Sequence, residues 1–146
     1  MPGIEKKIPL SLSLTGIKET GFSIRPDLRE KDIDRLDWMI GFRPILHQDH
    51  SLLSVEVSAA AVNLGSGFEV ASCSAMVTFH VEDIDTFVTK ESETRINVRD
   101  QLMLNMLNPA YGTLRGLIHA RFSGTLLENI PLPLIDVHDV LKAAKQ

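Results

Sequence analysis

The amino-acid sequence predicts an α+β domain, with strands in the first part of the chain and helices in the last third. Three observations support this fold class. Apolar and polar residues alternate from Leu10 to Thr15, as in a strand with one buried face. Two longer alternating runs, Leu52 to Leu64 and Phe68 to Val81, are joined by a short connection that contains glycine. From Asp100 onward, the apolar residues follow helical spacing.

Length and composition are those of one ordinary folded domain. A chain of 146 residues buries roughly 68 to 70% of its unfolded surface, so its core needs no metal or disulfide. The 15 basic and 19 acidic residues give a net charge of −4, and the basic residues do not gather in one stretch. Because phosphate binding depends on clustered Lys and Arg, we expect no nucleic-acid partner.

The first strand is predicted to begin near Pro9, which suits a strand start or a sheet edge. Its alternation breaks at Gly16 and Gly21. We therefore expect a bulge or bend, after which residues 22–25 continue the strand. The charged segment 27–37 that follows is predicted to be a loop or one short exposed helical turn.

The second strand is predicted from Trp38 to His47. It contains Gly41 and Pro44. Because proline cannot donate a hydrogen bond to a neighbouring strand, we expect this strand to lie at a sheet edge or to carry a bulge.

The clearest strand signal is the hairpin around Gly65-Ser66-Gly67. Before the turn, one face carries the apolar residues Leu53, Val55, Val57, Ala59 and Ala61. After the turn, one face carries Ala71, Cys73, Ala75, Val77, Phe79 and Val81. Each strand therefore has one strongly apolar face. Cys73 is the only cysteine, and its place on such a face predicts a buried, unreactive thiol.

Helical spacing extends from about Asp100 to Arg121. Pro109 removes a backbone donor and clashes with the preceding turn, so we predict that the regular helix starts near Pro109. Gly124 is a natural stop for it. A last helix is predicted from Val137 to Lys145, with Asp136 as its N-cap.

The sequence contains no motif for catalysis or metal binding. The segment from His47 to His50 has two imidazoles three residues apart but no third ligand, so we interpret it as a solvated turn. Glu82, Asp83 and Asp85 lack the spaced oxygen ligands of a calcium loop and predict an acidic strand-to-helix turn. No serine lies in a G-x-S-x-G elbow. We expect no enzymatic activity and no cofactor.

The hydropathy pattern predicts no membrane insertion. No stretch of about 18 consecutive apolar residues occurs, and the first residues lack the continuous apolar run of a signal peptide. We therefore expect a cytoplasmic protein.

The segment from Tyr111 to Leu141 is the most informative part of the chain. An apolar helix passes through Gly124-Thr125 into a connection rich in leucine and proline, and then into the final helix. Loops normally carry polar side chains, so an apolar connection predicts an ordinary core, an oligomer contact or a binding groove. Its apolar residues are Leu126, Leu127, Ile130, Leu132, Leu134 and Ile135.

This pattern resembles that of the SecB-like chaperones, the family of the bacterial export chaperone SecB. The family has a helix with an early Tyr, a Gly-Thr stop, a crossover loop rich in Leu and Pro, and a final helix opened by Asp. The corresponding residues here are Tyr111, Gly124-Thr125, Leu126, Pro131-Leu132-Pro133, Ile135-Asp136 and Leu141. Residues 12–28 also resemble the first strand of the family and its bend before a proline.

The resemblance implies one domain over residues 1–146, with a four-stranded antiparallel sheet and two C-terminal helices packed on one face. It implies dimers joined through the first long helix, or tetramers formed as a dimer of dimers. It also implies that unfolded polypeptide binds in an apolar groove under the crossover loop. The residues that we predict to bind polypeptide are Leu46, Val77, Phe79, Leu107, Tyr111, Leu126, Leu132, Leu134, Ile135 and Leu141.

The leading functional hypothesis is a chaperone that holds nonnative polypeptide without ATP, either in export with the ATPase SecA or in protection of an antitoxin. Thr20 and Ile24 stand where export SecB carries acidic residues that meet SecA, which argues against SecA docking. One alternative is a structural or adaptor oligomer with a dedicated protein partner. Another is a small-molecule-binding protein with a cavity between helix and sheet.

Overall fold

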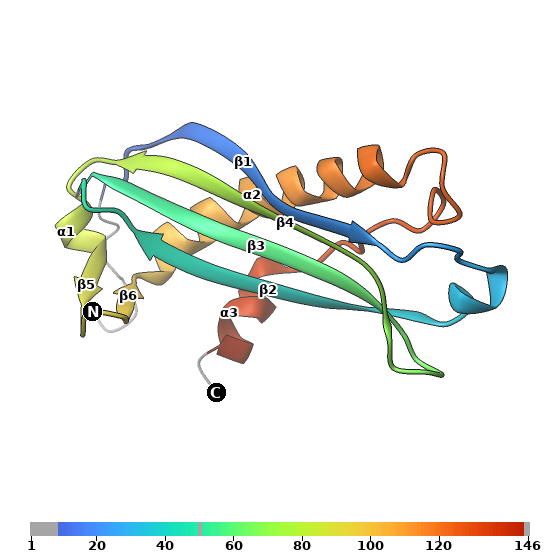
Figure 1. The fold of residues 1–146 in the computed structure, drawn as a ribbon. Coiled ribbons are helices and arrows are strands. Elements are labelled where there is room, and N and C mark those ends of the chain that lie inside the picture. Colours follow the sequence, from blue (N-terminus) through green and yellow to red (C-terminus); the bar gives the residue numbers. More distant parts are fainter. Residues whose placement is uncertain (1–8, 50, 145–146) are drawn as a thin grey trace.

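A four-stranded antiparallel sheet with two helices on one face forms the body of the molecule (Figure 1). The computed structural model describes residues 9–49 and 51–144. The strands lie in the order β1-β4-β3-β2. Their bounds are β1 Leu12–Ile24, β2 Leu36–Leu46, β3 Leu52–Asn63 and β4 Glu69–Val81. The predicted α+β class, the four-stranded sheet and the helices on one face are confirmed.

The hairpin and the irregular first strand are also confirmed. In the β3–β4 turn, the Asn63 side-chain oxygen accepts hydrogen bonds from the backbone N–H groups of Gly65 and Ser66, both at 2.9 Å. Gly67 has a φ of 78°, a backbone conformation that favours glycine. The pairing of β1 with β4 shifts register twice, next to Gly16 and next to Gly21, where the sequence predicted a bulge or bend.

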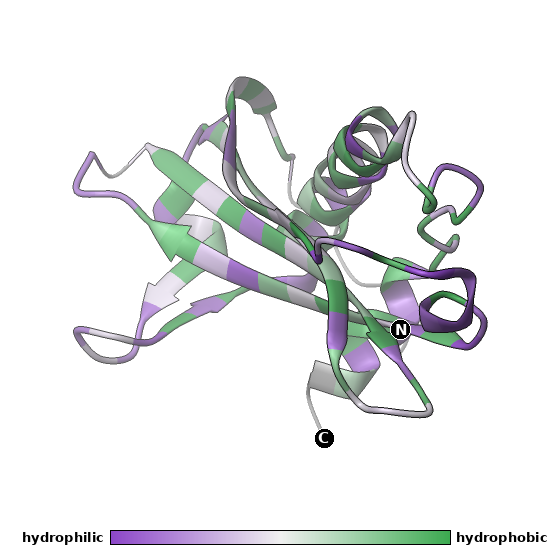
Figure 2. Ribbon diagram, turned by 45° about the vertical axis from the view of Figure 1, so that its right-hand side comes forward, coloured by the Kyte–Doolittle hydropathy of each residue, from purple (hydrophilic) through white to green (hydrophobic). Residues whose placement is uncertain are grey.

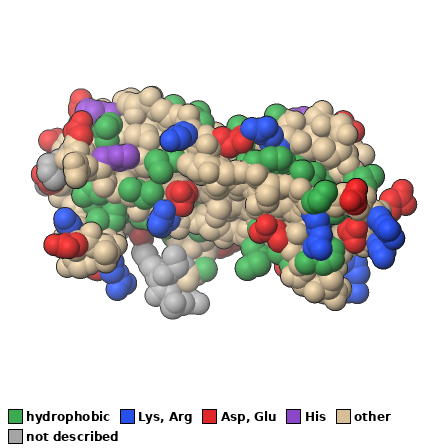
Figure 3. All heavy atoms as spheres, in the orientation of Figure 1, with side chains coloured by type: hydrophobic (Ala, Val, Ile, Leu, Met, Phe, Trp, Pro, Cys, Tyr) green, Lys and Arg blue, Asp and Glu red, His purple; other side chains and the backbone are tan. Residues whose placement is uncertain are grey.

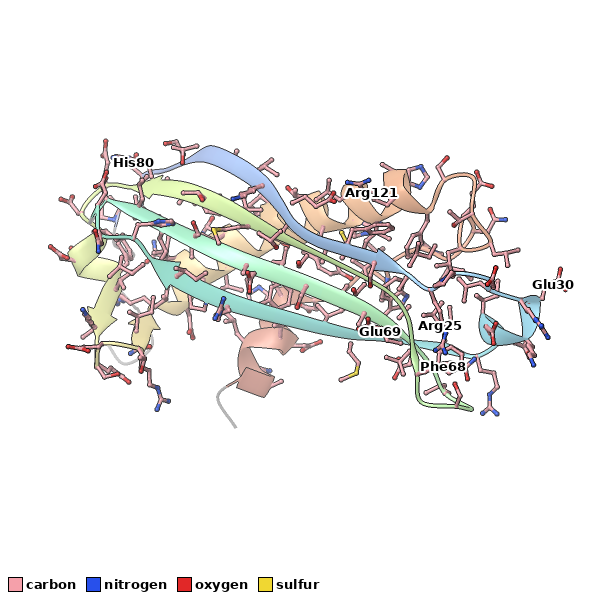
Figure 4. All side chains as sticks on the ribbon, in the orientation of Figure 1. Arg25, Glu30, Phe68, Glu69, His80 and Arg121 are labelled. Carbon is pink, nitrogen blue, oxygen red and sulfur yellow. The ribbon has the colours of Figure 1, made fainter. Side chains whose placement is uncertain are left out.

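The β1–β2 connection contains a single 3₁₀ turn, η1 (Glu30–Asp32), as predicted for this charged segment. It lies at the same end of the molecule as the hairpin turn, because the Asn63 side-chain amide donates to the Asp32 carbonyl at 2.7 Å. At this end the Arg25 guanidinium carbon lies 3.9 Å from the centre of the Phe68 ring (Figure 4). These contacts hold together segments that are far apart in sequence.

A second, two-stranded sheet at the opposite end of the molecule was not predicted (Figure 1). It follows the short helix α1 (Ile84–Phe87) and consists of β5 (Val88–Lys90) and β6 (Ile96–Val98). The acidic strand-to-helix turn before α1 is confirmed. Within residues 9–49 and 51–144, no three acidic, histidine or cysteine residues are grouped to hold a metal ion. His50 of the predicted solvated turn lies outside the described residues.

The long helix α2 runs without interruption from Asp100 to Phe122, so the predicted start near Pro109 is wrong. Pro109 is exposed, whereas residues on both sides of it are buried, among them Met106, Leu107 and Ala110. Burial of these side chains against the sheet outweighs the lost backbone hydrogen bond. The helix is followed by Gly124 at a φ of 80°, which confirms the predicted stop.

The last helix, α3, spans Val137–Ala144. The Asp136 carboxylate accepts a hydrogen bond from the His138 N–H at 2.9 Å, as predicted for an N-cap. Lys145, the predicted end of this helix, lies outside the described residues.

The hydrophobic core lies between α2 and the sheet. Apolar and polar residues alternate along the central strands, so that one face of the sheet meets the helix (Figure 2). Cys73 is buried in this core, as predicted, and burial raises the pKa of its thiol. Within the described ranges, no helix has the length and apolar character needed to cross a membrane.

Candidate functional site

The crossover loop, residues 123–136, joins α2 to α3 and is partly a core element. Leu127 is fully buried and Leu132 is 3% exposed. The Thr125 hydroxyl fixes the start of the loop, because it donates to the Phe122 carbonyl at 2.7 Å and accepts from the Leu127 N–H at 3.1 Å. The loop is therefore packed onto the rest of the chain instead of projecting into solvent.

Tyr111 holds the far part of the crossover loop. Its side chain is buried on α2, and its hydroxyl donates a hydrogen bond to the Pro133 carbonyl. Burial raises the pKa of the hydroxyl above its usual value of 10.0. A single side chain therefore links the middle of α2 to the Leu/Pro-rich part of the loop.

Two leucines of the crossover loop point outward from this anchored backbone. Leu126 is 47% exposed and Leu134 is 80% exposed. An exposed leucine on its own is ordinary. Here both leucines belong to a short loop whose neighbouring leucines are fixed in the core, so the loop presents apolar side chains on a rigid support.

A groove of about 510 Å³ runs between the solvent side of α2 and the crossover loop. We call it the α2–loop groove. The α2 side is open because Gly112 and Gly116 have no side chains, and nothing lies within 4 Å of a Cβ placed on either. The rest of the lining is Arg115, Ile118, His119, Phe122, Glu128, Asn129, Ile130, Pro131 and Leu132.

The inner side of β2 contributes an aromatic surface that the sequence analysis did not include among the site residues. The Trp38 ring stacks on Phe122 with a centroid distance of 6.2 Å, and the Phe42 ring meets Tyr111 at 6.2 Å. Trp38 and Phe42 are half-buried, as is Ile40 between them. The alternation of these residues in the predicted edge strand was the signal that could have identified them.

The structure divides the predicted polypeptide-binding residues into three groups. Five are buried in this chain and contribute to its core: Val77, Phe79, Leu107, Tyr111 and Leu132. Three are half-buried, namely Leu46, Ile135 and Leu141. Leu126 and Leu134 alone among the ten are exposed.

The outer face of the sheet, which Figure 3 shows, is rich in hydroxyl groups that pair with one another. Ser23 and Ser72 lie 2.8 Å apart, and Thr20 donates to Ser74 at 2.9 Å. Hydrophobic and charged side chains are interspersed on this face (Figure 3). The arrangement satisfies its own polar groups and offers no concentrated charge for a ligand.

A chain of hydroxyl and imidazole groups links the residue after β2 to β3 and β4 near one end of the sheet. His47 Nε2 lies 2.5 Å from Ser54 Oγ, which lies 2.6 Å from Thr78 Oγ1. Ser54 is fully buried. Because a substrate cannot reach a fully buried oxygen, this contact joins strands and does not form a nucleophile and base for an exposed substrate.

Comparison with known proteins by sequence finds no matching family model and no matching curated protein. Comparison by structure does find similarity. A SecB-like chaperone of Mycobacterium tuberculosis, solved in complex with a ChAD peptide from the HigA1 antitoxin, superposes with a TM-score of 0.55. The alignment covers 86% of this chain and 91% of the other, at 13% sequence identity.

The chain has the SecB-like fold. The resemblance predicted from the crossover segment is thus confirmed at the level of the fold. Few side chains are shared at this identity, so the same fold is built here largely from different residues.

Proposed function

We propose that this SecB-like chain is a chaperone that binds unfolded or nonnative polypeptide without ATP. The observation that carries this proposal is the exposure of Leu126 and Leu134 on an anchored loop, of which residues 128–132 line the α2–loop groove. Covering apolar surface contributes about 25 cal/mol per Å² whatever the sequence of the ligand. An ordered apolar loop therefore suits clients that share hydrophobic segments and little else.

The geometry assigns different roles to the predicted site residues. Leu126 and Leu134 make first contact with the client, and the half-buried Ile135 and Leu141 extend that surface. The buried residues act as the rigid support, with Tyr111 as the anchor of the loop. The proposal includes no cofactor, no enzymatic activity and a cytoplasmic location.

An antitoxin segment is the client class that the structural neighbour suggests, because that chaperone was solved with an antitoxin peptide. No comparable observation supports SecA as a partner of this chain. Thr20 is uncharged and bonds to Ser74 on the outer face of the sheet, where a carboxylate would be needed for the SecA contact implied by the resemblance.

The test uses suppression of the aggregation of a chemically unfolded client, followed by light scattering. Wild-type protein is compared with the double variant Leu126→Asp, Leu134→Asp, in which two exposed apolar side chains become charged. The matched control is Leu64→Asp, because Leu64 is 56% exposed at the β3–β4 turn and is not part of the crossover loop. We expect the double variant to need at least about tenfold more protein for equal protection, since burial of each leucine contributes about 2 kcal/mol.

Two results would contradict the proposal. One is a wild-type protein that protects the client no better than an inert protein does. The other is a double variant that protects as well as the Leu64→Asp control. Because all three positions are exposed, circular dichroism spectra should be the same for every variant.

The alternative proposal is an adaptor oligomer in which the crossover loop is permanently covered by a second copy or by one partner. The burial of Leu127 and Leu132 shows that part of the loop already packs as core, which is how a permanent interface would continue. Solution mass and binding of a dye specific for apolar surface separate the two proposals. A large oligomer that binds no dye favours the adaptor.

A further inference from the structure

Of the two edges of the main sheet, β2 offers the better template for another strand. The other edge, β1, is interrupted by two register shifts, which twist an edge and protect it from pairing. In contrast, β2 pairs with β3 from Leu36 to Leu46 without a shift. Its open side is therefore regular.

Pairing at both ends of β2 determines which backbone groups are free. The Leu64 N–H donates to the Arg35 carbonyl at 2.8 Å, and the His47 N–H donates to the Leu52 carbonyl at 3.2 Å. In antiparallel pairs only every second residue bonds to a given neighbour. Odd-numbered residues of β2 therefore bond to β3, and the even-numbered ones direct their N–H and C=O groups to the open edge.

Two side-chain observations agree with this assignment. The Trp38 N–H, which points to the open edge, is held by the carboxylate of Asp37 at 2.9 Å instead of by another strand. Pro44, which has no N–H, also falls at an even-numbered position, where its lack of a donor breaks no bond to β3.

The free part of the edge has a definite length. The β5–β6 hairpin lies beside the last residues of β2, and together they enclose a cleft of about 610 Å³. Pro44 cannot donate to an added strand. The run available for pairing is thus Leu36 to Phe42, which we call the β2 edge.

Side chains on the two sides of the β2 edge differ in kind. The even-numbered Trp38, Ile40 and Phe42 lie on the inner side and are half-buried and apolar. On the outer side, the exposed Asp37 and Arg43 have opposite charges six residues apart. Arg43 bonds to Glu56 at 3.0 Å, yet its side chain is 68% exposed and has further donors.

We propose that the β2 edge binds an extended polypeptide segment as a fifth, antiparallel strand with a defined sequence pattern. Alternate apolar residues of the segment pack beside Trp38, Ile40 and Phe42. An acidic residue lies opposite Arg43, and a basic residue lies opposite Asp37, whose carboxylate is released when the segment bonds to the Trp38 N–H. This inference rests on the proposed function, because it specifies which polypeptides the chaperone prefers.

The pattern defines a seven-residue probe, the peptide Glu-Val-Thr-Val-Thr-Val-Lys. In the antiparallel register, the amides of its three valines face β2. The amides of its two threonines and its lysine face away. We therefore compare two peptides with three N-methyl groups each, one methylated at the valines and one at the threonines and lysine. Binding to the full chain is measured by fluorescence anisotropy.

We expect the valine-methylated peptide to bind at least about tenfold more weakly than the other, because it loses three backbone donors. Exchanging the terminal Glu and Lys of the unmethylated peptide should also weaken binding. Equal affinities of the two methylated peptides would overturn the inference. If the two methylated peptides bound equally but the protein still bound unfolded clients, the proposed chaperone function would stand without this inference. If the protein bound neither peptides nor clients, both the inference and the proposed function would be wrong.

The variant Ile40→Pro provides a second test on the protein side. It removes an open-edge donor, as Pro44 already does, without removing a bond to β3. We expect peptide binding to fall at least about fivefold, with the sheet signal in circular dichroism retained. A drop in solution mass together with tighter peptide binding would show that the edge belongs to a contact between copies, which would overturn the inference. If the Ile40→Pro variant unfolds, the comparison of the two methylated peptides on the wild-type protein still tests whether a peptide pairs with the β2 edge.

Discussion

Tyr111 combines packing and polar contact in one side chain. Its ring meets Phe42 of β2, and its hydroxyl donates to the Pro133 carbonyl of the crossover loop. The change Tyr111→Phe keeps the ring and removes only the donor. We expect the free energy of unfolding to fall by about 1 kcal/mol, measured by urea denaturation. An unchanged value would mean that the hydroxyl does not hold the loop.

The same hydroxyl predicts a dependence of stability on pH. Burial raises the pKa of Tyr111 in the folded chain above its unfolded value of about 10. The protonated hydroxyl of Tyr111 therefore contributes its full share to the free energy of unfolding below about pH 10, and this contribution is lost as pH rises through the folded-state pKa. Tyr111→Phe should therefore lose less stability than wild type in alkaline solution. Tyr111 is the only tyrosine, so tyrosinate absorbance reports its pKa directly, and a normal pKa would contradict the prediction.

The leucines of the crossover loop show what the sequence could not predict at this scale. The apolar character of the loop is plain in the sequence, but Leu132 is 3% exposed and Leu134 is 80% exposed. A loop has no fixed period that assigns alternate residues to one face. The difference arises from contacts with α2, such as the hydrogen bond of Tyr111 to Pro133, which lies 22 residues later in the chain.

Among the elements, α2 shows packing overriding local preference. Proline inside a helix costs about 3 kcal/mol relative to alanine, yet Pro109 lies within the regular helix. We therefore expect Pro109→Ala to raise the free energy of unfolding by about 1 to 3 kcal/mol in urea denaturation. Gly116→Ala, also exposed on α2, is the matched control and should add only about 0.5 to 1 kcal/mol. No gain at Pro109 would indicate that alanine does not restore the hydrogen bond.

The strands differ in how well the sequence predicted them. The β3–β4 hairpin has twelve or more residues on each side with clear alternation, so its bounds are close to the prediction. Three-residue strands such as β5 and β6 are too short for a period to appear. Pro44 correctly predicted that β2 lies at the edge of the sheet. The stacking of Trp38 on Phe122 of α2 could not be predicted from the strand, because it depends on how the helix packs on the sheet.

At the scale of the whole molecule, one helix does not cover the whole inner face of the sheet. The long helix packs on β3 and β4, which are the central strands. Near its C-terminal end the helix reaches β1 through Arg121, which Figure 4 labels: this residue forms an ion pair with Glu19 at 2.6 Å, and its guanidinium carbon lies 5.1 Å from the centre of the Phe22 ring. Between this contact and Leu12, which packs against the core, the inner side of β1 is exposed in the part of the chain that the structure describes.

Leu14 and Ile17 mark that uncovered region. They pair with Phe79 and Val77, so their side chains lie on the inner face, yet they are 47% and 53% exposed. We predict that a second copy covers them in a homo-oligomer. The double change Leu14→Lys, Ile17→Lys should shift the mass in sedimentation toward the monomer, because two like charges would face the interface.

The control for this prediction is Leu64→Lys, at the exposed β3–β4 turn, which should leave the mass unchanged. Thermal unfolding distinguishes loss of assembly from loss of fold. In an oligomer, the midpoint rises with protein concentration, and the double variant should lose that dependence while it still unfolds cooperatively. A wild-type protein that is monomeric at every concentration would contradict the prediction. An oligomer that both lysines leave intact would place the contact between copies on another surface, with the crossover loop as the next apolar surface to test.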